Sequence, residues 1–134
     1  MSSKPESQFI AYVNKNYVRC YSEKMANPYR GGTPDCWYSG EIRDLWAEYK
    51  YIVIPKRADS VVVPNLSALQ LMWLRERHAE GRNVCVIVGC KEGGVFLWQP
   101  QEWGEGITAG EFRTRVVSRT LLGEEISNFC GAVT

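Results

Sequence analysis

The spacing of apolar residues along the chain predicts alternating helices and strands. Phe9, Ile10 and Val13 fall at intervals that share one helical face, which predicts a helix over residues 5–15. Residues 45–54 are apolar on both alternating faces, and a proline follows them, which predicts a strand in the sheet interior. The first half of the chain therefore mixes a helical period with a strand period.

The rest of the chain continues this alternation. The other expected elements are strands at residues 17–22, 35–40, 83–90 and 95–98, helices at residues 66–80, 108–118 and 121–129, and a loop at residues 99–107. We expect Asn65 or Ser67 to cap the helix at residues 66–80, and Leu69, Met72 and Trp73 to line its inner side. This order predicts an α/β domain with a mixed sheet.

The composition supports one domain. The 134 residues are 45% hydrophobic and contain neither a repeat nor a low-complexity tract, so we expect one domain over residues 1–134. No apolar run resembles a signal peptide or a membrane span, so we expect a cytoplasmic protein without membrane association. The five cysteines form no CxxC pair, which argues against a zinc site and favours free thiols.

The charges are distributed unevenly, although the formal net charge is only +1. Basic residues predominate between Lys50 and Lys91, and acidic residues predominate after Lys91. A basic middle segment suits a localised nucleic-acid surface. Ordinary solvated charge explains the same pattern equally well, so the charge alone does not choose a partner.

Two polar residues interrupt the apolar strand at residues 45–54. Strand alternation places Glu48 and Lys50 on one face and Tyr49 on the other. A divalent metal would explain why a charged pair occupies such a strand, because Asp35 and Glu48 are the oxygen ligands that Mg²⁺ prefers. Lys50 would then orient the attacking water or balance charge in the transition state. The alternative is a buried ion pair of Lys50 with either carboxylate and no catalysis.

Four short motifs occur in a specific order. They are Arg-Gly-Gly-Thr-Pro-Asp from Arg30, Trp-Ala-Glu-Tyr-Lys from Trp46, Leu-Ser-Ala-Leu-Gln from Leu66, and Gly-Arg-Asn-Val-Cys-Val-Ile-Val from Gly81. Their order and spacing resemble the PD-(D/E)xK nuclease superfamily, and most of all its VRR-NUC branch, the virus-type replication-repair nucleases. The resemblance implies a restriction-endonuclease-like core with the order αβββαβ at about residues 6–98. A C-terminal hairpin and helical extension, the latter at about residues 99–134, completes the expected fold.

The resemblance also implies roles for individual residues. Asp35 and Glu48 match the metal-binding carboxylates, Lys50 matches the catalytic lysine, and the backbone carbonyl of Tyr49 matches a further metal ligand. Gln70 matches the family's helix glutamine near the site, although its residue type alone would suit a solvated helix position. A tyrosine at position 49 departs from the family, which usually has a small aliphatic residue there.

Glu6 matches the acidic residue on the family's first helix and is a candidate metal ligand. The alternative for Glu6 is an interaction with the dipole at the helix N-terminus. Arg30, Lys56, Arg57 and Arg82 are candidate phosphate contacts, because basic side chains supply most of the affinity for DNA.

The expected function is that of a Mg²⁺-dependent DNA endonuclease of phage or bacterial type, with Mn²⁺ able to replace Mg²⁺ and no organic cofactor. The resemblance further implies a homodimer that acts on branched or Holliday-junction DNA, since a symmetric pair of sites cuts a symmetric junction. Two alternatives remain open at this stage. One is a non-catalytic binding module on the same fold, and the other is a nuclease for RNA or foreign duplex DNA.

Overall fold

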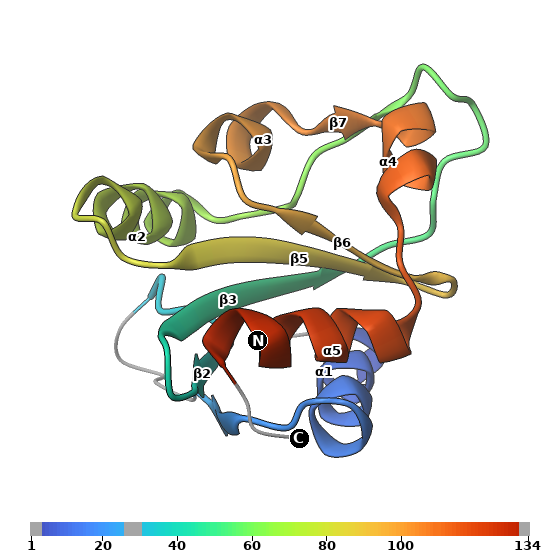
Figure 1. The fold of residues 1–134 in the computed structure, drawn as a ribbon. Helices are drawn as coiled ribbons and strands as arrows, with labels where there is room; N and C mark the ends of the chain where they lie inside the picture. The colour runs from blue at the N-terminus through green and yellow to red at the C-terminus, as the bar shows by residue number, and fades with distance from the viewer. Residues whose placement is uncertain (1–3, 26–30, 132–134) are drawn as a thin grey trace.

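A five-stranded mixed β-sheet with helices on both faces forms the centre of the molecule (Figure 1). The computed structural model describes residues 4–25 and 31–131. The strands lie in the order β1 (Tyr21–Lys24), β2 (Cys36–Ser39), β3 (Asp44–Tyr51), β5 (Val84–Cys90) and β6 (Gly93–Leu97). Strands β3 and β5 are parallel, and the other neighbouring pairs are antiparallel. The predicted α/β class with a mixed sheet is therefore confirmed.

The helices divide between the two faces of the sheet (Figure 1). Helices α1 (Lys4–Asn16) and α5 (Arg119–Cys130) contribute to the buried cluster on one face. Helices α2 (Ala68–Ala79), α3 (Pro100–Glu105) and α4 (Ala109–Arg115) contribute to the cluster on the other face. The short strands β4 (Val61–Val62) and β7 (Ile107–Thr108) pair separately, above this second face. Within the described residues, no helix has the length and apolar character needed to cross a bilayer.

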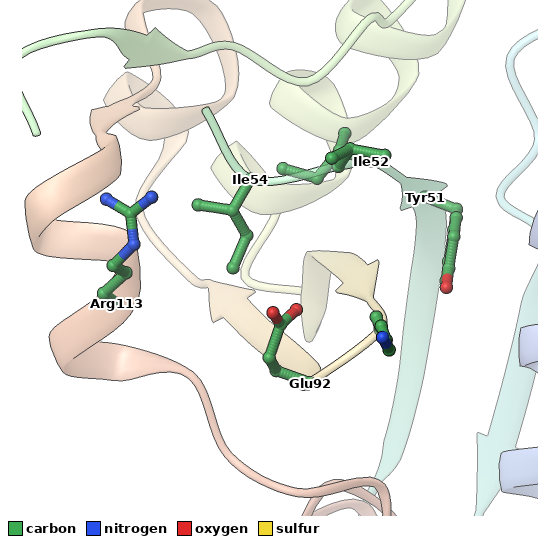
Figure 2. A pocket seen from close by; sticks show the side chains of 7 residues that line it. Tyr51, Ile52, Ile54, Glu92 and Arg113 are labelled. Carbon is green, nitrogen blue, oxygen red and sulfur yellow. The ribbon is translucent and has the colours of Figure 1, made fainter. Parts of the chain in front are cut away.

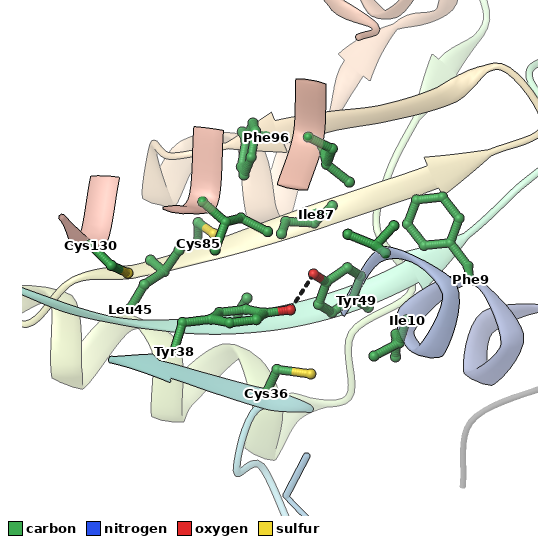
Figure 3. Packing of buried hydrophobic residues seen from close by; sticks show 14 residues of the cluster. Phe9, Ile10, Cys36, Tyr38, Leu45, Tyr49, Cys85, Ile87, Phe96 and Cys130 are labelled. Atoms are coloured by element: carbon green, nitrogen blue, oxygen red, sulfur yellow. Dashed lines mark hydrogen bonds between the residues drawn. The ribbon is translucent and has the colours of Figure 1, made fainter. Parts of the chain in front are cut away.

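The central strand β3 supplies side chains to both cores, as its alternating pattern predicts. Leu45, Ala47 and Tyr49 are fully buried against α1 and α5, and Figure 3 shows Leu45 and Tyr49 within this cluster. Trp46 points to the opposite face and packs against the second cluster. Glu48 lies on that same face and is only 2% exposed. A carboxyl group is thus buried in the centre of the sheet.

Two expectations about chain segments are wrong. The strand expected at residues 17–22 begins only at Tyr21, and the loop expected at residues 99–107 contains helix α3. Pro100 occupies the first turn of α3, and the side chains of Gln99 and Glu102 form a capping box with the backbone. Proline at the first helical position and a reciprocal cap both favour helix initiation. The expectation of a loop relied on the Trp and Gly residues of this segment and overlooked these two signals.

The inner side of α2 also differs from the expectation. Leu74 is its buried residue, whereas Leu69 is 51% exposed and Met72 is 50% exposed. Trp73 is partly buried, as expected, together with Leu71. The helix is therefore rotated about its axis relative to the apolar stripe predicted from the sequence. Its N-terminal turn projects beyond the apolar core, where it meets the segment before β2.

Candidate active site

The pairing of β2 with β3 brings Asp35 and Glu48 together. Cys36 pairs with Ala47, so the residue before Cys36 lies opposite the residue after Ala47. Asp35 Oδ2 accepts the backbone N–H of Tyr49 at 2.8 Å, which holds this carboxylate at the start of β2. Side chains directly opposite in an antiparallel pair point to the same face. Asp35 therefore lies on the face of the sheet that carries Glu48 and Lys50.

Gly32 fixes the path of the segment that leads to Asp35. Its φ is +98°, a region that favours glycine, and a Cβ atom there would lie 2.6 Å from the carbonyl oxygen of Leu69. The backbone at Gly32 thus packs directly against the first turn of α2. A larger residue would separate this segment from the helix and shift Asp35 relative to β3.

Gln70 connects the same helical turn to the buried carboxyl. Its Oε1 accepts the backbone N–H of Ser67 at 2.9 Å, and Ser67 Oγ accepts the N–H of Gln70 at 3.1 Å. This reciprocal cap holds the Gln70 side chain in one orientation. Its Nε2 donates to Glu48 Oε2 at 3.0 Å. The structure therefore places the Gln70 side chain against Glu48 and not in solvent, while its role in the site stays a prediction.

Glu48 is the most perturbed acid of this group. Its pKa is raised to about 9, first by burial and then by the negative charge of Asp35, while Lys50 acts in the opposite direction. Lys50 Nζ lies 3.7 Å from Glu48 Oε2, and the lysine side chain remains 19% exposed. Glu48 Oε1 is buried and accepts no hydrogen bond from the described residues, and a hydrogen bond between the Glu48 and Asp35 side chains further raises the pKa of Glu48. Such an atom incurs a desolvation penalty that a proton or a cation would relieve.

The backbone carbonyl of Tyr49 points toward the same open space. The backbone N–H groups of Trp46 and Ile52 donate to the carbonyl oxygens of Asn83 and Gly89, on the β5 side of β3, at 2.9 Å each. The amide of Tyr49 donates to Asp35 instead, on the opposite side of β3. The amide and carbonyl of one strand residue point in the same direction. The Tyr49 carbonyl is therefore directed to the side of Asp35, beyond the point where β2 begins.

These groups fit a magnesium ion in their chemistry. Two carboxylates and a backbone carbonyl are hard oxygen donors, and Mg²⁺ binds proteins through one or two carboxylates while keeping several waters. The unpaired Glu48 Oε1 gives a further reason, because a cation would satisfy it. Within the described part of the chain, no three Asp, Glu, His or Cys side chains are grouped closely enough to form a complete metal cage.

Glu6 lies near this group without completing it. It is in the first turn of α1 and is 8% exposed. Burial raises the pKa of the Glu6 carboxyl, and the charge of Asp35 raises it further, while Lys50 acts in the opposite direction. These electrostatic contacts place Glu6 within range of the site, although it does not form a three-acid cluster with Asp35 and Glu48. Its role as a metal ligand stays a prediction.

The candidate phosphate-binding residues are dispersed. Lys56 and Arg57 are exposed in the loop that follows β3, and Arg57 is paired with Asp59 at 3.1 Å. Arg82 lies just before β5, and Val88 of β5 pairs with Lys50. Arg82 is therefore about 20 Å from the position of Lys50, measured along β5. Arg30 lies outside the described residues. Lys56 and Arg57 thus follow β3 in an exposed loop that contacts the start of α4, whereas Arg82 lies at the opposite end of the sheet from Lys50.

A small cavity lies beyond the C-terminal end of β3 (Figure 2). Its volume is about 220 Å³, and its lining residues are Tyr51, Ile52, Val53, Ile54, Lys91, Glu92 and Arg113. Arg113 reaches it from α4 and donates a hydrogen bond to the carbonyl of Pro55. None of Asp35, Glu48, Lys50 and Gln70 lines this cavity. The candidate site therefore lies outside this cavity.

Sequence reasoning missed the contact between Gly32 and the first turn of α2. The signal was present as two consecutive glycines before Pro34 and a Ser-x-x-Gln cap at Ser67. Glycine pairs indicate a sharp turn or a close backbone approach, but they do not identify the segment that is approached. The rotation of α2 about its axis determines which of its residues contacts Gly32, and this rotation was not predicted.

Comparison with solved structures identifies the fold. The structure is similar to that of Hjc from Archaeoglobus fulgidus, described as a Holliday junction resolvase from an archaeal hyperthermophile. The similarity covers 92% of this chain and 99% of that chain, with a TM-score of 0.56 and 14% sequence identity. No family model matches the sequence, and no curated protein matches it.

The similarity covers nearly the whole length of both proteins, so the α/β architecture is shared across the chain and not in one motif alone. The chain therefore has the same α/β fold, with a mixed five-stranded sheet flanked by helices. The assignments to the PD-(D/E)xK superfamily and to its VRR-NUC branch stay predictions from the motifs.

Proposed function

We propose that this protein is a metal-dependent nuclease that hydrolyses phosphodiester bonds in DNA. One observation carries the proposal: a buried carboxyl, Glu48, lies against Asp35 and Lys50 on the central strand, and its pKa is raised to about 9 by burial and by the charge of Asp35. The similarity to a protein described as a Holliday junction resolvase supports the same conclusion.

Each residue has a distinct part in the proposed reaction. Asp35, Glu48 and the Tyr49 carbonyl would hold the metal, which supplies Lewis-acid polarisation of the phosphate and lowers the pKa of a bound water. Glu48 would have to lose its proton to hold the metal, since its pKa is raised to about 9. Gln70 keeps Glu48 Oε2 in place by its hydrogen bond of 3.0 Å.

Lys50 is suited to act on the reacting groups directly. Its ammonium group lies 3.7 Å from Glu48 Oε2 and remains partly exposed, so it can reach a phosphate at the strand edge. From this position it would orient the attacking water and neutralise negative charge that develops on the phosphate oxygens. Removal of the lysine should therefore reduce the rate of cleavage more than the affinity for DNA.

We further propose that the substrate is branched DNA and that the active form is a homodimer. The resemblance in fold to a protein described as a Holliday junction resolvase motivates the substrate. Two symmetric sites are the simplest way to cut a symmetric junction on both strands. Sedimentation of the protein with and without a four-way junction would measure the number of chains per complex.

A cleavage assay tests the proposed function. Supercoiled plasmid, a four-way junction, linear duplex and RNA would each be incubated with Mg²⁺, Mn²⁺ or EDTA. We expect metal-dependent cleavage of DNA that falls about 10²–10⁴-fold in Lys50→Ala. Lys15→Ala is the matched control, because Lys15 is an exposed lysine in the last turn of α1.

Two results would contradict the proposal. One is binding of DNA without cleavage under every metal condition, which is the behaviour of a non-catalytic module. The other is cleavage that Lys50→Ala and Lys15→Ala reduce equally, since a contaminating nuclease would produce that pattern. Cleavage of RNA in preference to DNA would correct the substrate and leave the chemistry intact.

A further inference from the structure

A row of aromatic rings continues from the candidate site across the same face of the sheet. Trp37 follows Asp35 by two residues on β2, and Trp46 precedes Glu48 by two residues on β3. The two tryptophans are cross-strand partners, with ring centroids 6.0 Å apart. Because residues two apart on a strand point to the same face, Trp37 lies about 7 Å along β2 from Asp35. The row of aromatic rings therefore begins at Trp37 and Trp46, each two residues along the chain from one of the carboxylates.

The row extends in both directions from this pair. Tyr21 of β1 contacts Trp37 with a centroid distance of 5.8 Å, and Trp73 of α2 contacts Trp46 at 5.4 Å. Arg77 lies over the Trp73 ring at 5.4 Å, and Trp46 and Trp73 pack against the second buried cluster. Core packing therefore accounts for Trp46 and Trp73.

Core packing does not account for Trp37 and Tyr21. Within the described residues, neither ring belongs to either buried cluster. Tyr21 is 57% exposed, and Trp37 is partly exposed. Trp37 Nε1 nevertheless donates to Asp44 Oδ2 at 2.8 Å, which restricts the orientation of the ring. An orientated, accessible tryptophan beside a candidate active site is suited to contact a ligand with a flat apolar face.

The charges around these rings select the part of a nucleotide that fits. Asp44 is bound to Trp37, and Glu23, the cross-strand partner of Trp37, accepts a hydrogen bond from the Tyr21 hydroxyl at 3.0 Å. Two carboxylates repel a phosphate, whereas they can accept hydrogen bonds from the N–H groups of bases, including the ring N3–H of thymine. The neutral, planar base is therefore the part of a nucleotide that complements this surface.

We propose that Trp37, with Tyr21 beside it, forms a stacking subsite for one unpaired base next to the scissile phosphate. The proposal rests on the proposed function, which places a DNA phosphate at Asp35 and Glu48. In an intact duplex the bases are paired and stacked on each other, so they do not reach a ring beside the helix. Stacking on aromatic rings is sequence-tolerant and contributes to single-strand binding in many proteins. The preferred substrate is accordingly DNA with unpaired nucleotides at the cleavage position.

Binding experiments in EDTA test this proposal without any cleavage. The fluorescence anisotropy of labelled short oligo(dT) and of a matched linear duplex would be measured with the wild-type chain and four variants. Trp37→Ala and Tyr21→Ala remove the two rings, and Trp37→Phe retains a stacking surface. Tyr12→Ala is the control, because Tyr12 is 46% exposed and lies on α1, on the opposite face of the sheet.

We expect Trp37→Ala to weaken the binding of oligo(dT) about 5- to 150-fold, which corresponds to the loss of one stacked base. Trp37→Phe should lose less affinity, and Tyr12→Ala should bind as the wild type does. The affinity for the duplex should change little in every variant. Because Tyr21 is outside both buried clusters, Tyr21→Ala should keep the thermal unfolding midpoint of the wild type and still weaken oligo(dT) binding.

Two outcomes would overturn the stacking subsite. One is equal affinity of the wild type, Trp37→Ala and Tyr21→Ala for oligo(dT), and the other is an equal loss of duplex and single-strand affinity in the two ring variants. If no metal-dependent cleavage occurs but Trp37→Ala still loses oligo(dT) affinity, the nuclease proposal fails and the subsite is supported. If cleavage depends on Lys50 but the ring variants bind normally, only the subsite fails.

Discussion

Gln70 Nε2 donates a hydrogen bond of 3.0 Å to Glu48 Oε2, which joins the N-terminal turn of α2 to the central strand β3. The same side chain accepts the backbone N–H of Ser67 at 2.9 Å. One glutamine therefore completes a helix cap and satisfies half of a buried carboxyl. The candidate site and the local stability of α2 are consequently coupled through this residue.

Replacing Gln70 with alanine should lower the free energy of unfolding by about 1–3 kcal/mol, because a buried oxygen and a helix-cap amide lose their partners. Urea denaturation monitored by circular dichroism would measure the change. Gln101→Ala is a suitable control, since Gln101 is an exposed residue of α3, and we expect a change within about 0.5 kcal/mol there. Equal stabilities of the two variants would contradict the coupling.

The stability of the metal-free protein should fall as the pH rises from about 5 to about 9. The pKa of Glu48 is raised to about 9 in the folded protein, above its ordinary value of 4.5. The folded state then binds more protons than the unfolded state between these values, and its stabilisation is lost as the pH rises through the folded pKa. Urea midpoints in EDTA across this range would show the slope.

Glu48→Gln provides the control for this slope, because the amide is similar in shape and does not titrate in this range. The variant should show a flatter dependence of unfolding free energy on pH than the wild type. An unchanged slope in Glu48→Gln would assign the effect to another group, such as the Glu6 carboxyl, whose pKa is also raised by burial.

Binding of a divalent metal should strengthen with rising pH over the same interval. Glu48 must lose its proton to act as a ligand, so metal binding should release a proton below about pH 9. Calorimetric titration with Mn²⁺ in buffers of different ionisation enthalpy would count the protons released. Asp35→Asn should weaken the binding, and a pH-independent affinity would contradict the assignment of Glu48 as a ligand.

Gly32→Ala should destabilise the protein more than Gly81→Ala. Both glycines have a left-handed φ, +98° and +85° respectively, so both substitutions incur a backbone cost of about 1–2 kcal/mol. A Cβ at Gly32 would lie 2.6 Å from the Leu69 carbonyl oxygen, whereas a Cβ at Gly81 would meet nothing within 4 Å. The difference between the two unfolding free energies measures the contact with α2, and equal values would show that this contact contributes nothing.

Tyr38→Phe should cost more stability than Tyr49→Phe. The Tyr38 hydroxyl donates to Asn14 Oδ1 at 2.6 Å and lies 2.6 Å from the Tyr49 hydroxyl (Figure 3). Tyr49 is therefore the donor within the pair, since the single proton of Tyr38 is used by Asn14. Tyr38→Phe leaves two buried partners unsatisfied, at about 1–3 kcal/mol, whereas Tyr49→Phe removes one hydrogen bond, at about 1 kcal/mol. Thermal and urea unfolding of the two variants would order them.

The central elements of the fold and the residue types of the site were predictable from local patterns. The alternation in residues 45–54 correctly separated Glu48 and Lys50 from Tyr49, because side chains on a strand repeat every two residues. The motifs correctly suggested that Gln70 belongs beside Glu48. The segment at residues 99–107 was misjudged, because its helix depends on a cap formed by Gln99 and Glu102.

The sequence by itself thus determined which side chains share a face of each strand, since that depends only on the covalent period of the backbone. Only the tertiary structure decided that Gly32 contacts Leu69, that Asp35 receives the amide of Tyr49, and that Glu48 keeps an unpaired oxygen. These relationships join residues far apart in the chain, and they depend on strand register and on the rotation of α2. Burial, which sets the charge state of Glu48, likewise exists only once both layers of helices have packed on the sheet.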